Sequence, residues 1–198
     1  KSFHDKESFE MAFRYGEWLL SIQNNDGSWN GGMHPNSKPQ QSVFNTAQII
    51  IGLVSICEVS EEKIWKESLY RAAIWLAQNV NDQGLWENGH YNDFNPTYYT
   101  RVAWPMLLAN QILNETTISA SALKVLDKMS SRVLSNGSFE YWGFNKDQPA
   151  FTHTMAYTIR GFIESSLLIQ DWDRYAKLTE PAIDRLYKFS EINGGRLP

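Results

Sequence analysis

The chain has 198 residues, of which 42% are hydrophobic, which is enough for one substantial core. Its formal net charge of −4 and the lack of a basic run argue against nucleic acid as the main partner. The single cysteine, Cys57, excludes an internal disulfide framework, and the longest apolar stretch, 49–56, is too short to span a bilayer. No secretory signal is visible, which slightly favours a cytoplasmic location, but the chain begins at Lys1 rather than at Met.

The predicted helices alternate between two kinds along the chain. Segment 9–23 is amphipathic and precedes Gly27, segment 42–57 contains no charge, and segment 61–78 is again amphipathic and precedes Gly84. Segment 97–113 contains one charge, Arg101, and amphipathic segment 119–134 precedes Gly137. The series ends with segment 151–170 and with the amphipathic segment 181–192, which precedes Gly195.

This alternation predicts an all-α fold. A helix that is apolar all round is buried on all sides, whereas an amphipathic helix covers a core with one face. We therefore expect a ring of helical hairpins, with segments 42–57, 97–113 and 151–170 inside and the amphipathic segments outside.

The glycine-containing turns also carry a family resemblance. Gln23, Gly27 and Trp29 resemble the QW repeat of terpenoid cyclases, and Gln78, Gly84 and Trp86 form a second match; the third repeat has Phe139 and the fourth Leu197. The resemblance implies an α/α toroid, in which the Gln caps a neighbouring outer helix and the Trp stacks on it. Prenyltransferase β subunits, lanthionine cyclases and, as close relatives, many glycoside hydrolases and polysaccharide lyases share this toroid, so function has to be argued from a site.

The number of hairpins predicts an incomplete ring. Six or so hairpins of roughly 57 residues would need about 340 residues, and this chain holds about three and a half. We therefore expect residues 1–198 to be one domain of a partial or truncated toroid, the amino-terminal part of a longer protein or a half ring completed by another chain. Open apolar faces would favour self-association.

The candidate site lies where the inner helices begin. Aligning these helices on Ala47, Ala103 and Ala156 makes Asn45, Arg101 and Thr154 equivalent. The loops 29–40, 86–96 and 139–149 are expected over the same rim, and most of the polar and aromatic residues gather there.

Acid–base chemistry has two candidate arrangements at this rim. A lyase of acidic sugars would use Arg101 to neutralise the substrate carboxylate and Tyr99 or His153 to take the proton. A glycosidase would pair Glu140 with Glu87 or Asp93. Aromatic rings would stack on sugars while polar groups bond the hydroxyls, so the expected substrate-binding residues are Asn45, Glu87, His90, Tyr91, Asp93, Tyr98, Tyr141 and Trp142. Trp29, Trp86 and Phe139 are expected to be structural residues of the repeat.

No metal or other cofactor is expected. His34, His90 and His153, with Asp93 or Cys57, would be the only zinc ligands on offer, but their spacing is not that of a ligand set. Arg160 and Glu164, one helical turn apart, are expected to form an internal ion pair.

Three functional hypotheses follow. The leading one is a carbohydrate-active protein, either a polysaccharide lyase or hydrolase or a factor in polysaccharide biosynthesis, with an oligosaccharide or other small-molecule substrate. The alternative is a terpenoid-cyclase-like or prenyl-transferring protein, although the sequence contains no DxDD run and no recognisable Asp, Cys and His zinc set. The third is a non-catalytic helical scaffold whose rim binds a partner, so whether the chain is an enzyme stays open.

Overall fold

The computed structural model describes residues 6–31, 39–90 and 94–197, and the described part is almost entirely helical. Seven helices of 13 residues or more are α1 (Lys6–Ser21), α2 (Val43–Cys57), α3 (Lys63–Gln78), α4 (Thr100–Leu113), α5 (Thr116–Ser130), α6 (Thr152–Ile169) and α8 (Glu180–Ile192). Shorter elements are η1 (Thr97–Tyr99), α7 (Trp172–Tyr175), η2 (Ala176–Thr179) and the two-residue strands β1 (Asn30–Gly31) and β2 (Gln40–Gln41), which pair antiparallel. The expected all-α fold with seven main helices is confirmed.

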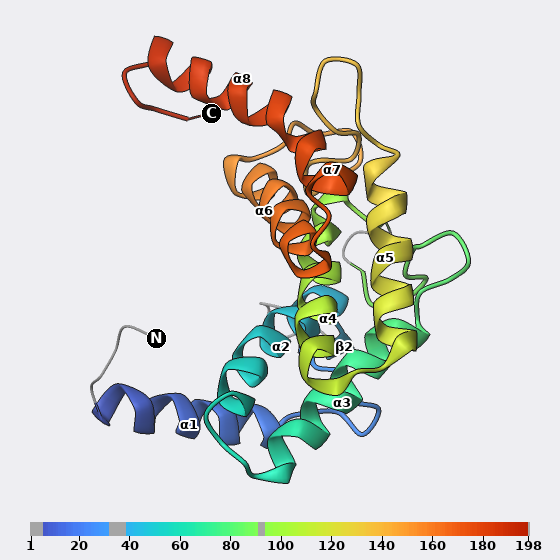
Figure 1. The fold of residues 1–198 in the computed structure, drawn as a ribbon, viewed down its shortest axis with the longest axis vertical. Coiled ribbons are helices and arrows are strands. Elements are labelled where there is room, and N and C mark those ends of the chain that lie inside the picture. The colour runs from blue at the N-terminus through green and yellow to red at the C-terminus, as the bar shows by residue number, and fades with distance from the viewer. Residues whose placement is uncertain (1–5, 32–38, 91–93, 198) are drawn as a thin grey trace.

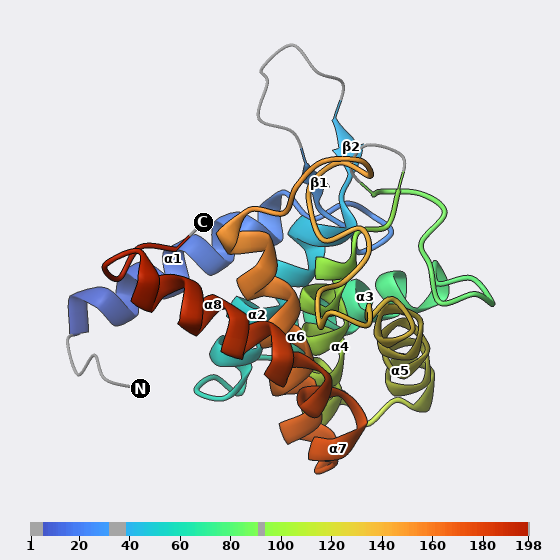
Figure 2. The same ribbon diagram turned by 90° about the horizontal axis from the view of Figure 1, so that it is seen from above.

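The helices form two layers. In the inner layer α4 packs against both α2 and α6, and the outer helices α3 and α5 pack on the inner helices and on each other. Figures 1 and 2 show α3 and α5 on one side of this inner layer, whereas α1 and α8 extend to the other side at opposite ends of the molecule. The expected alternation of inner and outer helices is therefore confirmed. None of the helices in the described part of the chain is long and apolar enough to cross a membrane.

Two of the inner helices, α2 and α6, keep an exposed side rather than being buried on all sides. An exposed stripe at helical spacing is formed by Asn45, Gly52 and Ser55 on α2 and by His153, Ala156, Arg160 and Leu167 on α6, whereas α4 exposes only Gln111 in its last turn. The expectation of full burial was therefore wrong for α2 and α6, because the outer layer covers only one face of the inner layer, whereas α4 is buried or half-buried apart from Gln111. We call the uncovered side the open face.

The repeated glycines form three equivalent turns. At each turn the glycine has a positive φ, and its backbone N–H donates to the carbonyl three residues earlier, at 2.9 Å for Gly27, 3.1 Å for Gly84 and 2.8 Å for Gly137. A Cβ built at Gly84 would lie 2.5 Å from the carbonyl oxygen of Lys124 on α5, so the close approach to the next outer helix requires glycine. The fourth turn differs, because Gly195 donates to the carbonyl of Ser190 instead.

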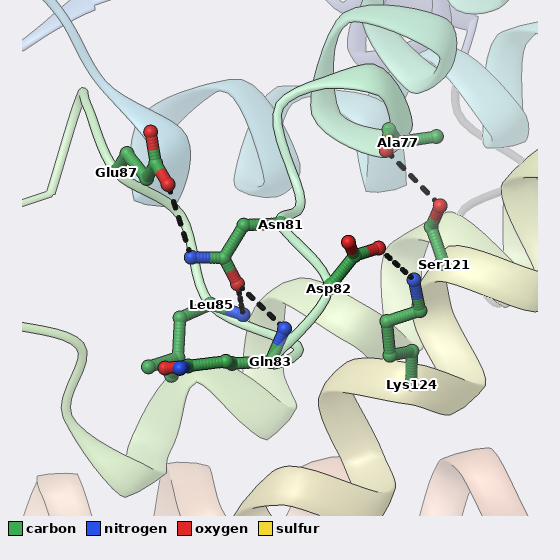
Figure 3. A network of polar contacts seen from close by, with 8 residues as sticks. All are labelled: Ala77, Asn81, Asp82, Gln83, Leu85, Glu87, Ser121 and Lys124. Carbon is green, nitrogen blue, oxygen red and sulfur yellow. Dashed lines mark hydrogen bonds and ion pairs between the residues drawn. The ribbon is translucent and has the colours of Figure 1, made fainter.

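The QW-like residues hold successive repeats together in part as the resemblance implies. Gln23 donates from Nε2 to the carbonyl of Ser68 on α3 at 3.1 Å and accepts from the hydroxyl of Ser68 at 2.8 Å. In the second repeat the link to the next outer helix comes instead from the Asp82–Lys124 ion pair and from Ser121, which donates to the carbonyl of Ala77 (Figure 3).

The two structural tryptophans are anchored in the same way. Nε1 of Trp29 donates to the carbonyl of Leu19 at 2.8 Å, and Nε1 of Trp86 donates to the carbonyl of Leu76 at 2.9 Å. Both side chains are buried, so these indoles fill the core between layers and do not face a ligand.

Candidate functional site

A cluster of aromatic rings joins the beginnings of the three inner helices. Tyr98 lies at its centre. Its ring centroid is 5.7 Å from that of Phe44 in the first turn of α2, 5.8 Å from that of Phe144 and 6.4 Å from that of Tyr157 on α6. Phe44 also contacts Tyr157 at 5.7 Å. The inner-helix starts therefore lie side by side and share one aromatic lining.

His153 extends this cluster onto the open face. Its imidazole lies 5.0 Å from the Phe144 ring, 5.7 Å from Phe151 and 5.8 Å from Tyr157, and the side chain is exposed. Three aromatic rings therefore flank this exposed imidazole.

One turn deeper, Arg101 on α4 is held by Gln48 on α2. Pro105 has no N–H, so the carbonyl of Arg101 lacks its usual helical donor, and Nε2 of Gln48 donates to this carbonyl at 3.3 Å. In return Nε of Arg101 donates to Oε1 of Gln48 at 3.0 Å. This reciprocal pair fixes the guanidinium beside the aromatic cluster.

Two guanidinium groups share the indole of Trp104. The guanidinium carbon of Arg101 lies 4.8 Å from the Trp104 ring centroid and 5.2 Å from that of Tyr157, and the guanidinium carbon of Arg160 lies 5.0 Å from Trp104. Arg160 also pairs with Glu164 through Nε and Oε1 at 3.1 Å, the contact expected from their spacing. Burial, followed by the charge of Arg160, lowers the pKa of Arg101 from its ordinary value.

The register of the third inner helix differs from the one expected. Ala47 and Ala103 are buried but Ala156 is exposed, so aligning the helices on Ala156 was wrong. Thr154, which this alignment made equivalent to Arg101, is buried and bonds the backbone of Phe151. The residue of α6 that is equivalent to Arg101 is Tyr157, three residues after Thr154, because the alignment has to be advanced by three residues for the buried positions to match.

Two of the predicted tyrosines lie in the core. Tyr99 is 1% exposed, with its ring 5.6 Å from Trp86 and 5.5 Å from Tyr98, and Tyr98 is 4% exposed. The burial of Tyr99 does not suit the proton-accepting contact with substrate that the sequence predicted, because its ring packs against buried Trp86 in the turn after α3. Tyr98 lines the aromatic cluster from beneath.

Glu87 and His90 lie elsewhere, in a polar cleft of about 630 Å³ whose described lining includes Asn24, Asn30 and Gln41. Glu87 is exposed and accepts a hydrogen bond from Nδ2 of Asn81 at 3.3 Å (Figure 3). Nδ1 of His90 is buried and makes no hydrogen bond to any residue that the structure describes.

Tyr141 and Trp142 lie on a third surface, against α8. They line a pocket of about 390 Å³ together with Lys146, Arg185 and Phe189. Buried Arg132 holds this loop: its guanidinium lies 5.0 Å from the Tyr141 ring, and its Nη1 donates to the carbonyl of Asn95 at 2.6 Å. Burial lowers the pKa of Arg132.

The remaining predicted residues are dispersed. Asn45 is exposed in the first turn of α2 and donates to the carbonyl of Asn30 at 3.3 Å. Glu140 is exposed, and its carbonyl accepts from the hydroxyl of Thr97. Tyr91, Asp93 and His34 lie outside the described residues. Within 6–31, 39–90 and 94–197 no three His, Cys, Asp or Glu side chains are grouped as metal ligands, and Cys57 is half-buried at the far end of α2.

Arg101 and His153 both contact Tyr157, and Gln48, Trp104 and Tyr157 are residues of this face that the sequence analysis missed. Gln48, Trp104 and Arg160 follow one another at intervals of 56 residues, as do Asn45, Arg101 and Tyr157. This constant interval was the available signal for the open face.

Comparisons with known proteins bear on the fold. No protein-family model matches the chain. The chain is similar to squalene–hopene cyclase of Zymomonas mobilis, with 31% identity over 107 residues, which cover 50% of this chain and 15% of the cyclase. The chain therefore corresponds to a small part of the length of this curated relative.

The similarity agrees with the α/α toroid that the QW-like repeats and the two helical layers indicate. It favours the terpenoid-cyclase-like hypothesis over the carbohydrate-active one. The comparisons do not support carbohydrate activity, and neither do the positions of Glu87, Tyr141 and Glu140, which are dispersed. The chain is thus an α/α toroid-type helical repeat similar over half its length to a terpenoid cyclase.

Proposed function

We propose that the open face of α2, α4 and α6 binds an isoprenoid hydrocarbon chain, as one wall of a terpenoid-cyclase-like site. The observation that carries the proposal is the continuous aromatic lining formed by Phe44, Phe144, His153 and Tyr157 over the buried ring of Tyr98. Similarity to a protein named for squalene, an uncharged and unsaturated hydrocarbon, supports the same ligand class.

The chemistry of the face suits such a ligand. Ring faces and edges gain dispersion energy against alkenes and exclude water, and they stabilise a positive charge that develops on a bound hydrocarbon. Leu167 is exposed and Leu108 half-buried farther along the same face, so an apolar chain can continue past the rings.

In the proposal, the charged groups of this face help to position the side chain of Trp104. Arg101 is bonded to Gln48 and Arg160 to Glu164, so both cations are held against Trp104. We assign no proton donor, since the sequence has no DxDD run and Glu164 is paired with Arg160.

Equilibrium binding tests the proposal. Farnesol, as a short isoprenoid probe, is titrated against the chain while tryptophan fluorescence is followed, with maltohexaose as the carbohydrate probe. We expect saturable binding of farnesol, a dissociation constant raised about tenfold by Tyr157→Leu, and no binding of maltohexaose.

A matched control is Tyr70→Leu, which changes an exposed tyrosine on the outer helix α3 and leaves the open face intact. Equal affinity of the wild type and the Tyr157→Leu variant would place farnesol elsewhere. Saturable maltohexaose binding without farnesol binding would instead favour the carbohydrate hypothesis.

A further inference from the structure

Helix α2 contains a glycine in its middle, Gly52, that no contact within the described part of the chain explains. After proline, glycine is the least favourable residue in a helix interior, so a glycine there needs a packing or conformational reason. Each of the other glycines that the structure describes has such a reason, either a positive φ or an atom within 3.0 Å of a Cβ built on it. Gly52 has neither, because it lies in a regular helix without a positive φ and its Cβ would meet no atom within 4 Å.

Gly52 faces away from the core of the chain. Ile50 and Val54, two residues to either side, occupy the opposite face of the helix and are 0% and 3% exposed, whereas Gly52 is exposed. Gly52 therefore lies in the middle of the open face, between Gln48 and Ser55 on α2. We call the gap left there, where a side chain would stand, the notch.

The notch lies beyond the aromatic cluster, on the path toward Leu108. Gln48 on α2 bonds Arg101 on α4, which fixes how the two helices lie side by side. Gly52 comes one turn after Gln48 and Leu108 two turns after Arg101, so both lie on the side of this pair that is away from the helix starts. Leu108 is half-buried, so the notch opens beside apolar surface.

We propose that a bound isoprenoid chain crosses α2 at Gly52, and that the notch sets how long a chain the open face accepts. This placement rests on the proposed function and adds the path that the chain takes beyond the rings. Phe44 in the aromatic lining and Gly52 are separated by about 12 Å along the axis of α2. A short chain can therefore occupy the aromatic lining alone, whereas a longer chain has to pass through the notch.

Titration of two isoprenoid alcohols that differ only in length tests the proposal, with tryptophan fluorescence as the readout. We expect Gly52→Leu to raise the dissociation constant of geranylgeraniol, the longer alcohol, about tenfold, because leucine fills the notch. The dissociation constant of geraniol, the shorter alcohol, should change by less than about twofold. Ala120→Leu, which places leucine at an exposed position of the outer helix α5, is the matched control and should change neither constant. Circular dichroism checks that each variant keeps its helix content.

Urea unfolding of Gly52→Ala tests whether the chain itself needs this glycine. We expect the midpoint of unfolding to rise, because the added Cβ meets no atom and alanine favours the helix. A lowered midpoint would assign the glycine to packing within the chain and would overturn the proposal.

The titrations distinguish the notch from the face as a whole. If Tyr157→Leu weakens geranylgeraniol binding but Gly52→Leu does not, the path through the notch is wrong and the proposed function stands. If Gly52→Leu weakens geraniol and geranylgeraniol equally, the notch does not select for length. If neither alcohol binds to the wild type, both the proposed function and the role of the notch are overturned.

Discussion

Gln48 and Arg101 bond each other twice across the interface of α2 and α4, once through the Arg101 side chain and once through its carbonyl. The second bond exists because Pro105 leaves that carbonyl without a helical donor. One side chain thus compensates for a proline inside an inner helix and sets the position of a cation on the open face.

The Gln48→Leu variant tests this pair. It removes both hydrogen bonds and leaves a carbonyl and a guanidinium N–H without their partners, so we expect the free energy of unfolding to fall by about 2 kcal/mol. Urea denaturation measures the change. Gln111→Leu, an exposed glutamine on α4, is the control and should change stability by less than about 0.5 kcal/mol; equal effects would deny the pair a structural role.

The glycine turns predict a contrast between two alanine variants. Gly84→Ala combines a positive φ with a clash against the carbonyl of Lys124 and should cost about 2–4 kcal/mol. Gly194→Ala has the positive φ alone and should cost about 1 kcal/mol. Thermal or urea unfolding compares them, and similar losses would show that the turn does not seat on α5 as described.

Two buried tryptophans allow the contribution of the indole hydrogen bond to stability to be distinguished from that of the ring. Nε1 of Trp86 donates to the carbonyl of Leu76, whereas Nε1 of Trp65 is buried without a partner in the described residues. Replacing either by Phe removes similar ring area, so Trp86→Phe should be more destabilising than Trp65→Phe by about 1 kcal/mol. Phe139 at the third turn shows that a Phe ring fits this type of position. A larger loss for Trp65→Phe would contradict the assignment.

Tyr175 predicts an alkaline loss of stability. Burial of the phenol, and its 2.6 Å hydrogen bond to Oδ1 of Asp127, raise the pKa of Tyr175 above its ordinary value of about 10. Above that pH the unfolded chain loses this proton while the folded chain keeps it, so the free energy of unfolding falls as pH rises, by up to about 1.4 kcal/mol per pH unit. Unfolding between pH 9 and 11 should show a shallower slope for Tyr175→Phe; an unchanged slope would exclude the group as its source.

Much of the fold could be predicted from hydrophobic periodicity, because the inner and outer helices differ in charge. Segment 42–57 corresponds to α2 within one residue, and 151–170 to α6 within one residue at each end. The short helices α7 and η2 after residue 171 were not predicted, since four-residue helices carry no periodic signal.

The candidate site was predicted less completely. The sequence correctly placed Arg101 near the start of an inner helix, but alanine is a poor marker of register because it is tolerated both in the core and on a surface. Choosing Ala156 therefore hid Tyr157. The sequence could not show which side of an inner helix is uncovered. Tyr99 and His153 were therefore equal candidates for the proton acceptor, although Tyr99 lies in the core and His153 is exposed.

A crystal structure of the chain grown with farnesol tests the central claim most directly. Our account predicts electron density for the isoprenoid chain along the open face, in contact with the ring of Tyr157 and directed toward Leu108. Density only in the polar cleft beside Glu87 and His90, or only in the pocket beneath Trp142, would contradict it.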